Sequence, residues 1–256
     1  FYRKQSETYE LAASTGEDPY ELIQRYLDNP SLHPSDLVDA FLNEAGEKRD
    51  LEFMDAKGHN LPFNEDKRFR MRFVRAKDLG PALWQAIQAD WKTDRLKPKT
   101  AYEGTLVYAL CEDEQEVKQA RDAVKTISEE NIAVAVPHEP QAFTETLLRV
   151  KACRHYLPPS EAEKISAQTE SRLRDILQNT QDGYLTRLKR RLNEIVDGDK
   201  ACWYKKSGAV LVDKPKQSHK AADVLCGMLF DKRCKIKHTD VSKIHDDRWR
   251  TGRNTA

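Results

Sequence analysis

The chain has 256 residues, of which 33% are charged, and its formal net charge at pH 7 is +1. This length is enough to bury one large core or two modest ones. No apolar run approaches the roughly 20 residues of a membrane-spanning helix, which argues against an integral membrane protein. The five cysteines are odd in number and widely scattered, as expected for reduced thiols in a cytoplasmic protein; they are Cys111, Cys153, Cys202, Cys226 and Cys234.

The small net charge hides an asymmetry. Residues 200–256 hold fourteen Lys and Arg against six Asp, which gives +8, and the first 199 residues therefore carry -7. A basic end can meet nucleic acid or an acidic partner, although a solvated lysine-rich face is the commoner cause. The chain starts at Phe1 without a signal-peptide pattern, and we expect it to be a fragment of a longer protein.

Residues 1–99 are predicted to form a helical and β-hairpin region. Helical apolar spacing covers 18–27 and 35–45, and apolar–charged alternation over 51–54 and 68–74 predicts two strands around a loop at 57–62. A further amphipathic helix is expected over 78–91, followed by a basic linker.

Three residues of the predicted hairpin resemble the end of a metal-dependent nuclease strand, in which carboxylates hold a divalent ion. They are Glu52, Asp55 and Lys57. No companion carboxylate on a second core strand is readable, so a charged hairpin edge is the favoured interpretation and a nuclease is a distant alternative.

Residues 100–158 predict a β-α-β-α unit. The runs 105–111 and 132–137 are apolar almost throughout, as in parallel strands covered on both faces. Asp113 and Glu116 form a capping box for the helix that connects these two strands. Glu139-Pro140 predicts the start of the second helix.

Residues 159–199 carry the longest helical periodicity. Ser160 and Glu163 form a capping-box pattern, and the apolar residues beyond them predict one long helix, or two helices broken near Asp182-Gly183.

Residues 200–256 predict a hairpin turned at Ser207-Gly208 and a helix over 218–230. Thiol and imidazole side chains in this region could in principle bind zinc; they are Cys226, Cys234, His238 and His245. Their spacing fits no tight zinc finger or ribbon, so no metal site is assigned. The fold class is therefore α/β (mixed α+β), with a basic C-terminal region for which a winged-helix arrangement is one interpretation.

The chain contains neither a Gly-x-Gly-x-x-Gly nor a Gly-x(4)-Gly-Lys-Ser/Thr motif, so no ATP site and no other cofactor is assigned to it. The segments 105–114, 134–140 and 147–156 resemble the post-ATPase region of the large P-loop proteins BrxC and PglY of bacterial anti-phage (BREX) systems. The long helix, Trp203-Tyr204 and the stretch 224–240 are similar to the next part of the chain in that family.

The resemblance covers residues 103–256 and implies a parent P-loop ATPase whose ATP-binding motifs lie upstream of Phe1. It implies a non-catalytic regulatory or assembly role, with other defence-system proteins or the parent ATPase core as partners. The residues themselves suggest an alternative, a nucleic-acid-binding module that contacts the phosphates of DNA. The side chains expected to do so are Lys205, Lys206, Lys232, Arg233, Lys235 and Lys237.

Overall fold

The computed structural model describes residues 17–46, 51–97, 101–157, 165–197, 200–213 and 219–230, and the backbone of 2–5 and 8–11. By its internal contacts the chain divides into two compact units, one formed by residues 1–47 and 143–190 and the other by 48–142 and 191–256. Within the described residues, no helix is both long enough and apolar enough to cross a lipid bilayer.

The first unit is mainly helical. Its elements are the antiparallel pair β1 (Tyr2–Gln5) and β2 (Thr8–Leu11), the helices α1 (Pro19–Leu27), α2 (Leu37–Ala45), α6 (Thr144–Tyr156) and α7 (Ala167–Gln178), and the start of α8 (Tyr184–Asp197). A 3-10 turn, η1 (Pro30–Leu32), lies between α1 and α2.

Helix α6 packs against α1, α2 and α7. The rings of Phe41 and Phe143, 4.6 Å apart between centroids, form part of this core. On the rim, the Glu44 carboxylate is 8% exposed and pairs with Lys151 at 2.8 Å and Arg154 at 2.7 Å. The expected helix after Glu139-Pro140 therefore starts later, at Thr144, and belongs to this helical unit rather than to the sheet.

The second unit contains a six-stranded sheet in the order β3-β4-β5-β6-β7-β8. Its strands are β3 (Phe53–Asp55), β4 (Arg68–Arg75), β5 (Gly104–Leu110), β6 (Ile132–Pro137), β7 (Ala201–Lys205) and β8 (Ala209–Asp213). The three central strands β4, β5 and β6 are parallel, and the outer pairings are antiparallel. The predicted α/β class and the parallel neighbours 105–111 and 132–137 are confirmed.

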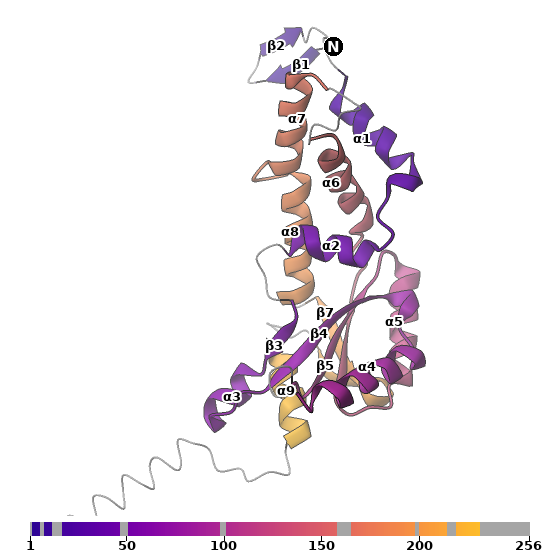
Figure 1. Ribbon diagram of the computed structural model, residues 1–256, viewed down its shortest axis with the longest axis vertical. Helices are drawn as coiled ribbons and strands as arrows, with labels where there is room; N and C mark the ends of the chain where they lie inside the picture. The colour runs from indigo at the N-terminus through magenta and orange to yellow at the C-terminus, as the bar shows by residue number, and fades with distance from the viewer. Residues whose placement is uncertain are drawn as a thin grey trace, which may run out of the picture. The chain divides into compact units, whose positions relative to one another are not determined.

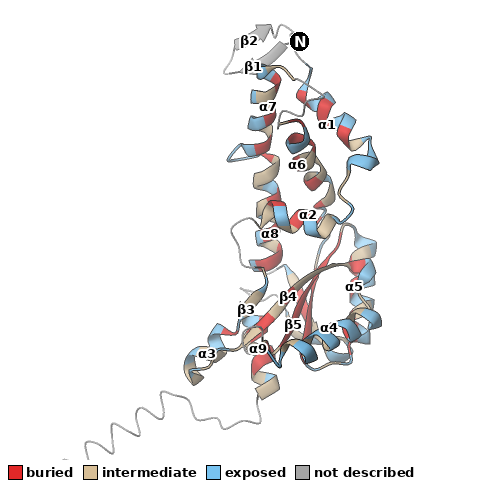
Figure 2. Cartoon of the chain, in the orientation of Figure 1, coloured by how far each residue is buried: buried red, intermediate tan, exposed pale blue. Residues whose placement is uncertain are grey.

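Helices cover both faces of this sheet. α4 (Pro81–Asp94) and α5 (Glu114–Ala123) lie on the same side (Figure 1), where Trp84, Val107, Val117 and Val134 join one buried cluster. α9 (His219–Phe230) contacts β3 and β8, the two edge strands, and therefore crosses the other face. This double cover explains why β5 is buried along its whole length (Figure 2).

One row of paired residues crosses the α9 side of the sheet. Phe73, Tyr108, Ala135 and Trp203 occupy one register line on β4, β5, β6 and β7. The rings of Phe73 and Tyr108 stack with centroids 4.9 Å apart, and Tyr108 meets Trp203 edge-on at 5.1 Å. Ala135 has the smallest side chain of the row, so space is left beside the ring of its neighbour Tyr108.

Local signals fix several helix starts. The Asp18 and Asp36 carboxylates accept N–H groups at the starts of α1 and α2, and Asp113 accepts the Glu116 N–H at 2.8 Å at the start of α5. In return, the Glu116 side chain accepts the Glu112 N–H at 2.7 Å. Glu112 is the residue before the capping residue Asp113, so the bond is shifted by one position from a standard capping box. The 3-10 turns η2 (Ala76–Asp78) and η3 (Val124–Thr126) adjoin α4 and α5.

Two expectations are corrected. The segment predicted as a loop at 57–62 is a helix, α3 (Lys57–Phe63), whose N-terminal N–H groups bind Asp223 of α9: Gly58 at 2.8 Å and His59 at 3.3 Å. The single long helix over 159–199 is two helices, the alternative that the break at Asp182-Gly183 predicted, and α7 is capped by Ser166. The capping-box pair at Ser160 and Glu163 lies outside the described residues.

The predicted hairpin is present. β7 and β8 pair antiparallel across η4 (Lys206–Gly208), with Ser207 at φ 58° and Gly208 at φ 70°. Positive φ at both central positions suits the right-handed twist of the strands. The winged-helix interpretation depends on residues 231–256, which lie outside the described part of the chain.

Candidate ligand-binding cavity

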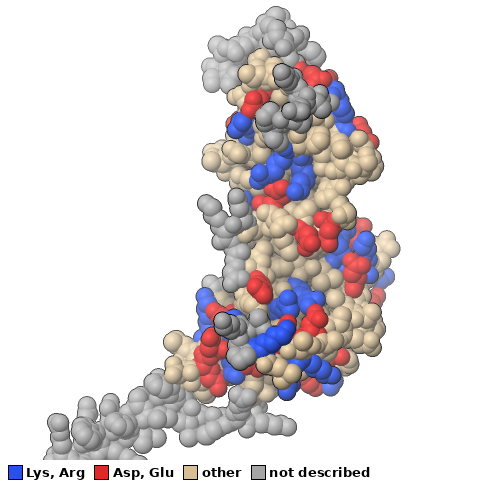
Figure 3. Space-filling view, viewed as in Figure 1, with Lys and Arg blue, Asp and Glu red and all other residues tan. Residues whose placement is uncertain are grey.

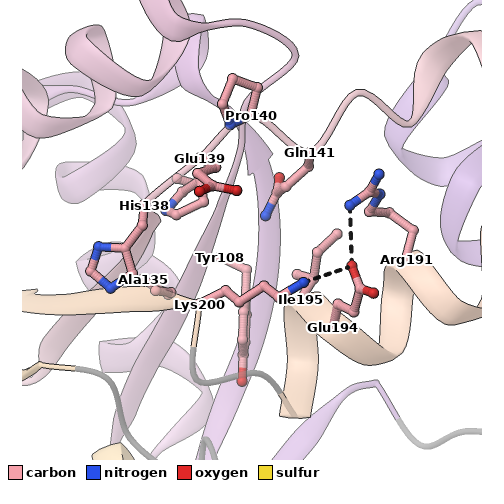
Figure 4. Close-up of a pocket in the computed structure, with 13 residues that line it drawn as sticks. Tyr108, Ala135, His138, Glu139, Pro140, Gln141, Arg191, Glu194, Ile195 and Lys200 are labelled. Carbon is pink, nitrogen blue, oxygen red and sulfur yellow. Dashed lines mark hydrogen bonds and ion pairs between the residues drawn. The ribbon is translucent and has the colours of Figure 1, made fainter.

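A cavity of about 320 Å³ lies in the second unit, where the parallel strands β5 and β6 end. The crevice at the carboxyl ends of parallel strands is the usual place for a ligand in open α/β sheets. Its walls come from these two strands, the 138–141 loop, the last turns of α8 and the start of β7 (Figure 4). Apolar lining is provided by Tyr108, Ala109, Ala135, Pro137, Pro140, Ile195 and Ala201.

Gln141 forms the most fixed polar part of the lining. Its backbone N–H donates to the Cys111 carbonyl at 2.8 Å, and its side-chain Oε1 accepts the Cys111 N–H at 3.1 Å. Because an N–H donor fixes which side-chain atom must be the oxygen, the amide nitrogen is held on the other side. Gln141 is only 9% exposed, and Figure 4 shows its amide nitrogen turned toward the space beside Tyr108.

The residue after Gln141 has an unusual backbone. Ala142 has φ 44°, in the left-handed region that costs an L-residue with a Cβ about 1–2 kcal/mol. The two bonds to Cys111 hold the chain in this conformation, so the orientation of Gln141 is set by a neighbouring strand rather than by its own segment.

An ion-paired group also lines the cavity. The Glu194 carboxylate is 3.1 Å from Arg191 Nη1 and 3.7 Å from Lys200 Nζ, as the dashed lines of Figure 4 show. Glu194 and Arg191 are partly exposed, and Lys200 is 65% exposed. Arg191, Lys200 and Glu194 together carry one net positive charge, which the exposed Glu139 at the rim offsets in the lining as a whole.

His138 and Glu139 line the rim. The His138 backbone N–H donates to the Lys200 carbonyl at 2.8 Å, which ties the loop to β7, and its ring lies apart from Gln141 in Figure 4. The His138 Nε2 atom is 3.7 Å from the Asp213 carboxylate. Glu139 is exposed, so solvent screens its charge.

The four cysteine thiols that the structure describes are poor nucleophiles. Cys111, Cys153, Cys202 and Cys226 are all buried and free. Burial raises the pKa of Cys111 to about 12, with the Glu116 charge as the next cause. Since the thiolate is the reactive form, the Cys111 thiol next to the Gln141 loop stays protonated near neutral pH.

Among the described residues, the side chains considered for metal sites are not gathered into one. No group of three or more His, Cys, Asp or Glu side chains suited to a metal occurs in the part of the chain that the structure describes. Asp55 ends the edge strand β3 and Lys57 begins α3, and the Glu52 carbonyl accepts the Met71 N–H at 2.8 Å. Of the zinc candidates, Cys226 is buried in α9, and Cys234, His238 and His245 lie outside the described residues.

Two of the predicted phosphate-binding residues are described, and both lie at the β7–β8 turn. Lys206 pairs with Glu130 at 2.9 Å, and this hydrogen bond holds the pKa of the Glu130 carboxyl below its usual value. Lys205 contacts the Met228 sulfur at 3.5 Å. Lys232, Arg233, Lys235 and Lys237 lie outside the described residues.

Charges of both signs lie next to this turn, since Lys206 pairs with Glu130 and Gly208 lies against Lys125, which pairs with Asp122. The Ser207 N–H donates to the Ile127 carbonyl at 2.8 Å, which docks the turn on the segment after α5. Basic and acidic side chains are interspersed over the described part of the face in Figure 3. The turn and the cavity lie at opposite ends of β7, so the predicted phosphate-binding residues and the cavity are separate sites.

No family model, no curated protein and no solved structure matches the chain. The cavity residues Gln141, Arg191, Glu194 and Lys200 were not predicted as a site from the sequence. One feature of the sequence could have pointed to this cavity: His138-Glu-Pro-Gln141 directly follows a predicted parallel strand. Ligands bind at the carboxyl ends of such strands in open α/β sheets.

Proposed function

We propose that the chain is a non-catalytic regulatory or assembly part of a large bacterial phage-defence ATPase. The family context comes from the resemblance of residues 103–256. The observation that supports a non-catalytic role is the start of α5, directly after β5, where an ATP-binding unit would hold phosphate on free N–H groups.

In this chain the phosphate-binding position is occupied by carboxylates. Asp113 accepts the Glu116 N–H at 2.8 Å, and Glu116 accepts the Glu112 N–H at 2.7 Å. Arg75, the cation nearest this turn, pairs with Glu116 at 2.8 Å and with Glu112 at 3.6 Å. The Glu112 and Glu116 N–H groups and the charge of Arg75 are thus engaged by carboxylates, and Glu114 adds another negative charge that repels phosphate.

The charged side chains of the second unit mainly join its own elements, as in a scaffold. Arg70 and Arg72 of β4 pair with Asp94 and Asp90 of α4, the first pair at 3.1 Å. Together with the pairs of Arg75, these contacts attach both covering helices to the strand beside β5.

ATP hydrolysis by the purified chain is the direct test. We expect no release of phosphate above the buffer rate and no saturable binding of ATP with Mg²⁺ in equilibrium dialysis. Hydrolysis that survives further purification would overturn the proposal. If the chain is part of a longer protein, a Walker A lysine upstream of Phe1 would support the ATPase context, and a complete upstream frame without one would remove it.

The alternative is a nucleic-acid-binding module, and the +8 charge of residues 200–256 favours it. Binding to labelled duplex and single-stranded DNA is expected to weaken steeply with salt. Replacing Lys232, Arg233, Lys235 and Lys237 together with glutamine should weaken binding more than Lys206→Gln, because Lys206 already pairs with Glu130. Binding that is absent, or insensitive to salt, would exclude this function.

A further inference from the structure

We propose that the cavity at the ends of β5 and β6 binds a small aromatic carboxylate, with Gln141 donating to a polar group on the ring and Arg191 and Lys200 facing the carboxylate. This inference stands independently of the role in a larger ATPase. It rests on an unused donor, on a cation pair that shares one counter-ion, and on the apolar wall between them.

The unused donor is the Gln141 amide. Its oxygen is committed to the Cys111 N–H, and its Nε2 atom makes no hydrogen bond with the residues that the structure describes. The residue is only 9% exposed, and Figure 4 shows the nitrogen aimed into the cavity. The nitrogen is not among the fully buried polar atoms that have no partner, so water can reach it, and a ligand acceptor can replace that water with a hydrogen bond of fixed direction.

The shared counter-ion is Glu194. Its carboxylate is held by Arg191 at 3.1 Å and by Lys200 at the longer distance of 3.7 Å. A ligand carboxylate that enters the cavity can take up Lys200 and one edge of the Arg191 guanidinium without leaving Glu194 unpaired. A cationic ligand would have to compete with both side chains.

The wall between these two ends is apolar and small. Tyr108, Pro137 and Ile195 contribute most of its bulky side chains, and Ala135 leaves space beside the Tyr108 ring. A volume of about 320 Å³ is at the lower end of small-molecule sites. The cavity therefore suits a compact ring with a polar group at one end and a carboxylate at the other.

The probe is 4-hydroxybenzoate, and the matched uncharged compound is 4-hydroxybenzyl alcohol. Titration of the whole chain with each compound, followed by amide chemical shifts in NMR spectra, gives the two dissociation constants. We expect saturable shifts with the carboxylate and binding about tenfold weaker for the alcohol, since a charged hydrogen bond contributes roughly a factor of ten. Equal affinities, or no saturable shift with 4-hydroxybenzoate, would overturn the proposal.

Variants separate the two ends of the site. Arg191→Gln should weaken 4-hydroxybenzoate about tenfold, whereas Glu194→Gln should strengthen it by freeing both cations. Gln141→Glu keeps an acceptor for the Cys111 N–H and adds a negative charge, so it should weaken 4-hydroxybenzoate more than the alcohol, whose phenol O–H can donate to the new oxygen. Lys97→Gln, just after α4 and outside the cavity lining, serves as the control and should change neither constant.

The sign of the Glu194→Gln effect is the sharpest outcome. Tighter binding of the carboxylate supports the assignment, and weaker binding contradicts it. Circular dichroism and the urea midpoint of each variant are measured first, and the Glu194→Gln result is decisive even if Gln141→Glu fails to fold.

Discussion

Replacing Gly104 by alanine is expected to force apart the first residues of β5 and β6. A Cβ at this position would lie 2.2 Å from the Asn131 carbonyl oxygen and 3.0 Å from the Asn131 Cβ. The same carbonyl accepts the Thr105 N–H at 2.8 Å, and Thr105 is buried. Because the obstacle is backbone, it cannot rotate away, and the strands themselves must move.

Two costs set the size of the expected loss of stability in Gly104→Ala. Overpacking of a well-packed interior costs about 1–3 kcal/mol. Loss of the buried hydrogen bond of the Thr105 N–H costs about 1–3 kcal/mol more. The two costs are not fully additive, because a single shift of the strand causes both. We expect the free energy of unfolding to fall by about 3 kcal/mol.

Urea unfolding followed by tryptophan fluorescence measures this change, since Trp84 and Trp203 are buried in the same unit. Gly227→Ala in α9 is the matched control, because a Cβ there meets no atom within 4 Å. In a helix interior that change should raise stability by up to about 1 kcal/mol. Equal midpoints for the two variants would refute the steric argument at Gly104.

Three further predictions concern single side chains. Glu44→Gln should lower the free energy of unfolding by about 2 kcal/mol in urea titrations, since it leaves Lys151 and Arg154 without their shared, nearly buried carboxylate; an unchanged midpoint would contradict this. Asp223→Ala should cost about 1 kcal/mol by uncapping α3, and Asp223→Asn, which keeps an acceptor, should cost less. The Cys111 thiol has its pKa raised to about 12 in the fold, so the stabilisation from its neutral form is present below the unfolded pKa and lost as pH rises toward 12. The stability difference between the natural chain and Cys111→Ala should therefore shrink from pH ~8 to pH ~11, and a constant difference would argue against the raised pKa.

The sequence predicted the elements whose signals are local. β5 and β6 were readable because parallel strands covered on both faces have apolar residues at nearly every position. Asp113 was readable as a helix cap because the capping bond spans only three residues. The turn at Ser207-Gly208 was readable for the same reason.

Elements stabilised by distant residues could not be read in this way. α3 contains Gly58 and Pro62, which both disfavour a helix, and its N–H groups are capped by a carboxylate 165 residues away in sequence. The start of α6 had a stronger local signal at Glu139-Pro140, but the 138–142 segment is held by backbone bonds from His138 to Lys200 and from Gln141 to Cys111. Those tertiary contacts keep the segment out of a helix until Thr144.

The same reasoning explains why the cavity was not predicted. Gln141 is an ordinary polar residue in a loop until the Cys111 N–H, from the end of another strand, takes its oxygen and turns its nitrogen inward. Arg191 and Glu194 have the pattern of a solvated helix face, and it is the fold that places β6 and the start of β7 beside them. The inward direction of the Gln141 donor and the presence of Arg191 from α8 in the same cavity are properties of the tertiary structure. A site of this kind is therefore best sought at the carboxyl ends of predicted parallel strands.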